Sequence, residues 1–208
     1  ATYVLSKPKN PYYVVVANTS LILIPYSIKP PPDYTFRSFT PIAQLASDQQ
    51  MLVVPAKSKF QSLSDLVAAA KTSKIRVGLT SATGTDAAVA RLVEAKEGVT
   101  FQHVILEAGS SSVAGMLAGN VDFSFLNPSE ALGQLQAKKL RALSVFSDKR
   151  YAAGTGLENV PTAKEQGVDV TFQQFRGLLG PPGLKPAEVK FWADAAKAWT
   201  GTQSYKDY

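Results

Sequence analysis

The sequence predicts an α/β protein whose sheet is mainly parallel. Between residues 51 and 146, short apolar runs rich in β-branched residues alternate with helical runs. Three connections from a strand to the next helix are loops of small polar residues, at 80–85, 109–112 and 127–129. Because open α/β sheets bind ligands at the carboxyl ends of their strands, these loops are the first candidates for a binding site.

The segment before this region is rich in proline. An aromatic and β-branched run at 12–17 predicts a buried strand. We expect a loop at 18–20, and Pro25 with the prolines at 30–32 argues against regular structure up to residue 42. A short apolar strand at 51–54 is stopped by Pro55.

Strand–loop–helix units follow one another in the middle of the chain. Ser62 followed by Asp65 predicts the start of a helix. Strands are then expected at 75–79, 103–106 and 121–126, with helices at 86–96, 113–118 and 130–138. A small-residue loop before a helix leaves main-chain N–H groups available to an anion. The chain continues with a strand at 140–146, a short helix at 162–166, an extended stretch at 168–179, a break at 181–183 and a helix at 186–199.

Composition excludes several classes of function. The chain has no Cys and a single His, so there is no thiolate zinc site or cysteine nucleophile, and no metal or cofactor is expected. The longest uncharged apolar stretch, 12–28, is interrupted by polar residues and proline, which argues against a membrane-spanning helix. The 22 Lys and Arg against 16 Asp and Glu give a net charge of +6, which favours anionic partners. The basic residues are scattered, so no nucleic-acid binding is expected.

The sequence offers little for catalysis. No Lys follows Gly84, so the loop at 78–85 is not a Walker loop, and neither a dinucleotide fingerprint nor a G-x-S-x-G elbow occurs. His103 and Asp122 stand among apolar strand residues and are interpreted as structural groups with local partners.

Several segments occur in a specific order. They are T-S-A-T-G-T at 80–85, G-N-V-D-F at 119–123, A-K-K-L-R-A-L-S-V at 137–145, N-V-P-T-A at 159–163 and R-G-L-L-G-P-P-G at 176–183. In this order and spacing, over nearly the whole chain, the sequence resembles the periplasmic solute-binding proteins of tripartite tricarboxylate transporters, the Bug family.

The resemblance implies a type II periplasmic-binding-protein fold, in which two α/β lobes joined by a hinge close on a ligand. Residues 1–55 and 172–208 would form the first lobe, and residues 56–171 the second. Family members carry further sequence on both sides of these residues, including an upstream P-G-G loop. The first lobe is therefore expected to lack its N-terminal part.

The resemblance also implies a function that is not enzymatic. Such a receptor captures a small organic carboxylate, for example a di- or tricarboxylate, in the periplasm and delivers it to the membrane subunits of the transporter. We expect a monomer. Where this chain has Leu126, family members often have Asp, and without that partner for a ligand ammonium we expect plain carboxylic acids rather than amino acids. The residues alone leave open an α/β enzyme or a ligand-sensing domain that uses the same anion-binding loops.

The candidate ligand-binding residues come from four segments of the chain. Main-chain N–H groups at a helix N-terminus are expected to hold a carboxylate, and they belong to Ser81, Ala82, Thr83, Gly84, Thr85 and Asp86. Asn127 follows a later strand. The opposite lobe is expected to contribute Asn18, Thr19, Ser20, Phe175 and Arg176, whose guanidinium would pair with a carboxylate through two hydrogen bonds.

Overall fold

A computed structural model describes residues 1–206 of the chain, which divide into two compact units. Unit 1 is Ala1–Ser47 together with the segment from Gln174 onward, and unit 2 is Asp48–Gln173. The sequence predicts the change of lobe after residues 55 and 171, and the compact units change after residues 47 and 173. Residues 207 and 208 of the predicted first lobe lie outside the described residues. That the units act as ligand-binding lobes stays a prediction.

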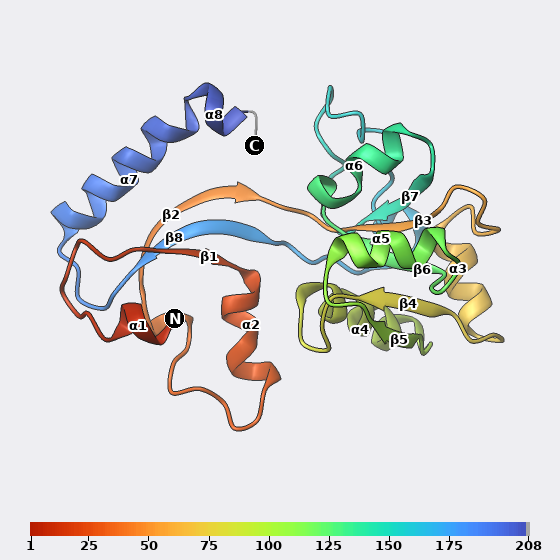
Figure 1. Ribbon diagram of the computed structural model, residues 1–208, viewed down its shortest axis with the longest axis horizontal. Coiled ribbons are helices and arrows are strands. Elements are labelled where there is room, and N and C mark those ends of the chain that lie inside the picture. The colour runs from red at the N-terminus through yellow and green to blue at the C-terminus, as the bar shows by residue number, and fades with distance from the viewer. Residues whose placement is uncertain (207–208) are drawn as a thin grey trace. The chain divides into compact units, whose positions relative to one another are not determined.

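Unit 1 contains a three-stranded antiparallel sheet (Figure 1). In it β8 (Phe175–Gly180) lies between β1 (Val15–Asn18) and β2 (Thr40–Ser47). The helices of the unit are α1 (Thr2–Leu5), α2 (Thr19–Ser27), the 3-10 helix η1 (Phe36–Ser38), α7 (Pro186–Thr200) and α8 (Gln203–Lys206). Helix α7 packs against β2, and its Trp192 Nε1 donates a hydrogen bond to the carbonyl of Pro11 (2.7 Å).

Four sequence predictions for unit 1 are wrong. The strand predicted to be buried at 12–17 is β1, and Val16 within it is 71% exposed because β1 lies at the edge of a small sheet. The expected loop at 18–20 is the start of α2, because Asn18 Oδ1 accepts a hydrogen bond from Leu21 N (3.4 Å) and caps the helix. Pro25 lies inside α2, near its end, where its missing N–H removes only one hydrogen bond. The segment up to residue 42, expected to be irregular, includes the first three residues of strand β2, and no strand was predicted over the rest of it. Its Pro41 and its two register shifts against β8 hide the alternation typical of a strand.

Unit 2 holds a five-stranded sheet in the order β5-β4-β6-β3-β7. Strand β4 (Arg76–Leu79) pairs in parallel with β5 (Gln102–Ile105) and β6 (Phe123–Leu126). Strand β3 (Met51–Pro55) runs antiparallel to both β6 and β7 (Leu140–Val145). Four strands therefore share one direction, as predicted, and β3 is reversed. The edge at which β4, β5, β6 and β7 end, and at which β3 begins, is called the carboxyl edge below.

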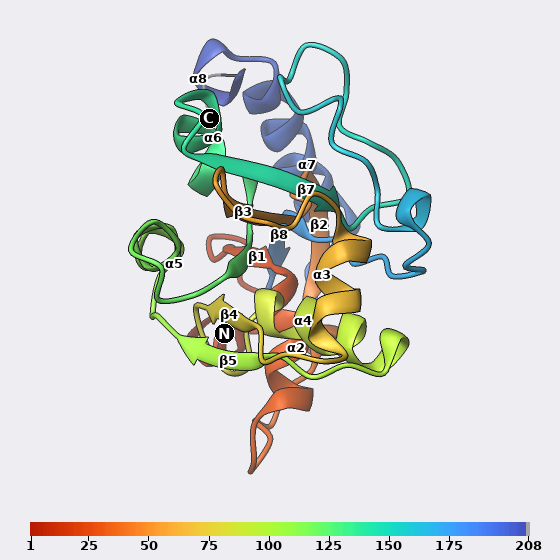
Figure 2. The ribbon, with the colours of Figure 1, turned by 90° about the vertical axis from the view of Figure 1, so that its right-hand side faces the viewer.

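Helices cover both faces of this sheet (Figure 2). Helices α3 (Leu63–Ala70) and α4 (Thr85–Glu97) lie on one side, and α5 (Gly109–Leu117) and α6 (Pro128–Gln136) on the other. Strand β3 divides its side chains between the two cores. Leu52 and Val54 pack with residues of α3 and α4, whereas Met51 and Val53 pack with residues of α5 and α6.

The helices of unit 2 begin earlier than predicted. Helix α4 begins at residue 85 rather than 86, α5 at 109 rather than 113, and α6 at 128 rather than 130. Glycine, serine and an initial proline suit the first turn of a helix as well as a loop, so residue type alone does not separate the two. Most residues of the second and third predicted loops are therefore first turns of helices.

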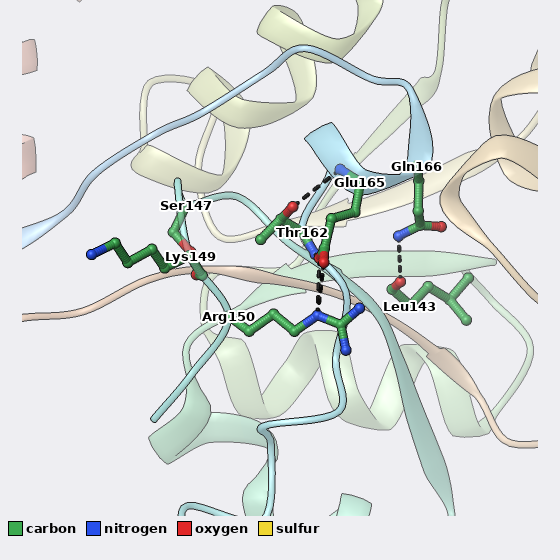
Figure 3. A network of polar contacts seen from close by, with 7 residues as sticks. All are labelled: Leu143, Ser147, Lys149, Arg150, Thr162, Glu165 and Gln166. Carbon is green, nitrogen blue, oxygen red and sulfur yellow. Dashed lines mark hydrogen bonds and ion pairs between the residues drawn. The ribbon is translucent and has the colours of Figure 1, made fainter. Parts of the chain in front are cut away.

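Polar contacts hold the long segment that follows β7 (Figure 3). Around the 3-10 helix η2 (Lys164–Gln166), Glu165 accepts hydrogen bonds from Arg150 Nε (3.0 Å) and Thr162 N (2.7 Å). Gln166 Nε2 donates to the carbonyl of Leu143 in β7 (2.8 Å). The hydrogen bonds from Arg150 and then from Thr162 lower the pKa of Glu165 to about 2.

Candidate functional site

Three connections meet at the carboxyl edge of unit 2. They follow β4, β5 and β6 and lead into α4, α5 and α6. Since β4 lies between β5 and β6, the three connections are neighbours, as the sequence predicts. Helix N-termini gathered at one edge carry partial positive charge on their N–H groups, which suits an anionic ligand.

The connection between β4 and α4 is organised around the carboxylate of Asp86, which is 2% exposed. Its Oδ2 accepts hydrogen bonds from the main-chain N of Thr80 and from Thr80 Oγ1, and its Oδ1 accepts one from Ala87 N (2.9 Å). The carboxylate thus offsets the positive end of α4 from within the loop. The Asp86 side chain therefore has a structural role. Only the main-chain N–H of Asp86 remains for the predicted ligand contact.

Gly84 is the N-cap of α4 and lies tightly against this carboxylate. A Cβ atom at Gly84 would lie 2.5 Å from Asp86 Oδ1 and 2.9 Å from Ser81 Oγ. The backbone is ordinary there, with φ of −74°, so glycine is needed for space and not for conformation. The absence of a side chain at Gly84 lets Asp86 reach its partners.

Several main-chain donors of this loop have no acceptor within the part of the chain that the structure describes. Thr83 N makes only a long hydrogen bond, to Ser81 Oγ (3.4 Å). No hydrogen bond among residues 1–206 uses the main-chain N–H of Ser81, Ala82 or Thr85. These groups precede or open a helix of 13 residues, where an anion is stabilised by the N–H groups and the helix dipole.

Two buried amide side chains lie at the same carboxyl edge. Asn127, which was predicted, is 6% exposed and follows β6, and Gln50 is 3% exposed and precedes β3. Continuing the register from the pair Met51 and Leu126 places Gln50 opposite Asn127. Gln50 Nε2 donates to Thr85 Oγ1 (3.3 Å), the first residue of α4. Within residues 1–206, Gln50 Oε1 and Asn127 Nδ2 are buried and have no hydrogen-bond partner, which marks them as candidate ligand contacts.

The sequence does not single out Gln50. It ends the polar run Asp48-Gln49-Gln50 before an apolar strand, a pattern typical of a surface loop. Its burial follows from the reversal of β3, which brings the beginning of this strand to the edge where its neighbours end. The polar run beside a buried strand is the only signal that points to it.

The remaining candidates lie in unit 1. Thr19 Oγ1 accepts a hydrogen bond from Phe175 N (3.1 Å), and Asn18 stands opposite Arg176 in the pairing of β1 with β8. The structure therefore brings these four residues together, while Ser20 is the second residue of α2. Asn18 uses its side-chain oxygen to cap α2. Ligand contact by the five residues stays a prediction.

The residues interpreted as structural have local partners, as expected. His103 Nε2 lies 3.0 Å from Glu94 Oε1, and Asp122 forms an ion pair with Arg76 (2.9 Å). Partial burial raises the pKa of Asp122, but the hydrogen bonds and charge of Arg76 outweigh this effect and hold that pKa below its ordinary value. In residues 1–206, no group of three or more His, Cys, Asp or Glu side chains is arranged to hold a metal ion. None of the helices in that range is long and apolar enough to cross a bilayer.

Solved structures identify the class of protein. A TctC solute binding protein from Polaromonas superposes with a TM-score of 0.85 at 28% sequence identity, over 99% of this chain and 70% of that one. MatC from Rhodopseudomonas palustris, solved with bound malate, superposes with a TM-score of 0.81 at 18% identity, over 97% of this chain and 69% of that one, and this likeness shows the fold alone. The fold is that of periplasmic solute-binding receptors, a class distinct from enzymes.

Sequence comparison then identifies the family. Residues 4–207 match the TctC family, described as tripartite tricarboxylate transporter family receptors. A UPF0065 protein from Cupriavidus necator is 30% identical over 168 residues, which are 80% of this chain and 50% of the relative. Another, from Pseudomonas sp. strain P51, is 29% identical over 191 residues, which are 90% of this chain and 56% of the relative. The chain belongs to the TctC family, as the resemblance to the Bug family predicts, and it spans about half the length of the curated relatives it matches.

Proposed function

We propose that this chain belongs to a periplasmic receptor that binds a small organic carboxylate and delivers it to the membrane subunits of a tripartite transporter. The observation that carries the proposal is the N-terminus of α4, where several main-chain donors have no acceptor among residues 1–206 and where the buried Gln50 contacts Thr85. Family membership supports a receptor function. Carboxylates as cargo are supported by two R. palustris proteins of the same fold, one solved with adipate and one with malate.

One carboxylate of the ligand is proposed to accept hydrogen bonds from the main-chain N–H groups of residues 81–86. A carboxylate at a helix N-terminus gains about 0.3–1 kcal/mol when exposed and up to about 2 kcal/mol when partly buried. Asp86 already places one negative charge in the first turn of α4, so a ligand anion needs a compensating cation. Arg176 of unit 1 is the proposed source of that charge, because a guanidinium binds a carboxylate through two parallel hydrogen bonds.

A thermal-shift screen of organic acids on the intact protein tests this function. A ligand at 100 times its Kd stabilises a protein by about 2.7 kcal/mol. In a chain of this size each kcal/mol raises Tm by about 2–4 °C, so the cognate acid should raise Tm by about 5–11 °C. The matched control is the amide of the same acid, which keeps the shape and loses the charge. If no mono-, di- or tricarboxylic acid raises Tm more than its amide does, the proposed function is wrong.

A further inference from the structure

On the basis of the proposed function, we infer that the ligand carries a hydroxyl group beside the carboxylate held at the N-terminus of α4, and that Gln50 and Asn127 bind this hydroxyl. The ligand class is thereby narrowed from carboxylic acids to hydroxy acids.

The first step is the placement of the two amides. Side chains alternate along a strand, so Gln50 lies on the same face as Leu52, and Asn127 on the same face as Phe125. Leu52 and Phe125 belong to the apolar cluster that includes residues of α4. Both amides therefore extend that face by one position at the carboxyl edge, where α4 begins. The hydrogen bond from Gln50 to Thr85 agrees with this placement.

The second step is the chemistry of the two atoms that lack a partner. Gln50 Oε1 accepts hydrogen bonds and Asn127 Nδ2 donates them, and each atom has less than 1 Å² exposed. A ligand carboxylate satisfies Asn127 Nδ2 but has no proton to donate to Gln50 Oε1. A hydroxyl donates to one atom and accepts from the other, so it satisfies both.

The third step is the distance between the hydroxyl and the carboxylate. Gln50 contacts the first residue of α4, and the main-chain donors without an acceptor belong to that residue and to the loop before it. The hydroxyl and the carboxylate must therefore stand close together in the ligand. A 2-hydroxy acid has this arrangement, since its two groups are on adjacent carbons.

Pairs of acids that differ only by one hydroxyl test the inference: malate with succinate, citrate with tricarballylate, and lactate with propionate. Titration calorimetry of the intact protein measures both members of each pair. In the pair that fits the site, we expect the hydroxy acid to bind about 10–100 times more tightly than the acid without the hydroxyl. The latter leaves a buried polar atom of the protein unsatisfied.

Two variants connect this preference to Gln50. Gln50→Met keeps the length of the side chain but not its hydrogen bonds, and it should abolish the preference. Gln49→Met is the matched control. Gln49 Oε1 is also buried without a partner among residues 1–206, but it stands one position earlier and so on the alternate face. This variant should retain the preference.

The possible results separate the inference from the proposed function. Equal affinities within every pair that binds contradict the inference and leave the proposed function intact. Failure of every acid to bind contradicts the proposed function. A preference that survives in folded Gln50→Met, verified by circular dichroism, also contradicts the inference. The wild-type comparison decides the ligand class even if that variant does not fold.

Discussion

Asp86→Asn perturbs the candidate loop at the group that organises it. The buried carboxylate accepts hydrogen bonds from Thr80 N, Thr80 Oγ1 and Ala87 N. Asparagine keeps one oxygen and replaces the other with an NH₂ group. The hydroxyl of Thr80 can reverse and accept from that group, but a main-chain N–H cannot. One of the two main-chain donors, on Thr80 or Ala87, therefore loses its acceptor.

The expected cost follows from these contacts. A hydrogen bond to a charged group contributes about 1.5–3 kcal/mol to stability. Loss of a negative charge from the first turn of α4 costs a further amount of about 0.3–1 kcal/mol. Asp86→Asn should therefore lower the free energy of unfolding by about 2–4 kcal/mol.

Urea denaturation measures this change, and Asp65→Asn is the matched control. Asp65 lies in the first turn of α3, where its Oδ2 accepts hydrogen bonds from Gln61 N (3.0 Å) and Ser62 N (3.1 Å), but it is exposed. Water can replace a lost partner there, so the expected cost is about 0.5–1 kcal/mol. A loss of stability in Asp86→Asn no larger than in Asp65→Asn would refute the structural role given to Asp86.

Gly84→Ala should lower the free energy of unfolding by about 1–3 kcal/mol, because its Cβ displaces the buried carboxylate oxygen. Gly133→Ala in α6 is the matched control, because a Cβ there meets nothing within 4 Å, and it should raise the free energy of unfolding by about 0.5–1 kcal/mol. Urea denaturation measures both variants, and a greater stability of Gly84→Ala than of Gly133→Ala would contradict this account. The pKa of Glu165 in the folded protein is about 2, against an ordinary value of 4.5. The contribution of Glu165 to stability is therefore fully present above pH 4.5 and is lost as the pH falls toward 2. Glu165→Gln should flatten that part of the acid dependence measured by denaturation, and an unchanged profile would count against the role of the Arg150 contact. Arg176→Ala should raise the Kd of a dicarboxylate by about 30-fold to several thousand-fold and Arg176→Lys should recover part of it, whereas wild-type affinity in calorimetry would exclude Arg176 from the site.

The parallel part of unit 2 was predictable because its inner strands, β4 and β6, are short and largely buried. Strand β6 is apolar at three of its four positions and buried at all four, and turn residues flank it. The direction of β3 was not predictable, since a buried apolar run looks the same in either direction. Its direction depends on pairing with β6 and β7, which is a property of the whole sheet.

Strand β2 escaped prediction for a different reason. It lies at the edge of the unit 1 sheet and pairs only with β8. An edge strand tolerates Pro41, which suggests a loop when it is considered alone. Two register shifts then break the alternation on which the prediction of a half-buried strand depends. In α2, similarly, the cap on Asn18 and the tertiary contact of Thr19 outweigh the local preference of Pro25.

In the candidate site, too, some features depend on the local sequence and others on contacts between distant residues. Main-chain donors at a helix start are indicated by small residues in a short stretch, so the loop at 81–86 was predictable from residue type. The direction of the Asp86 side chain was not, because it depends on a partner six residues earlier in the chain. Gln50 depends on strand order and is 35 residues away from Thr85, its contact. Loop geometry and the amides at 50 and 127 therefore come from separate parts of the chain. If both bind the ligand as proposed, substitution of the amides should change which acid is preferred while the carboxylate-binding loop keeps its structure.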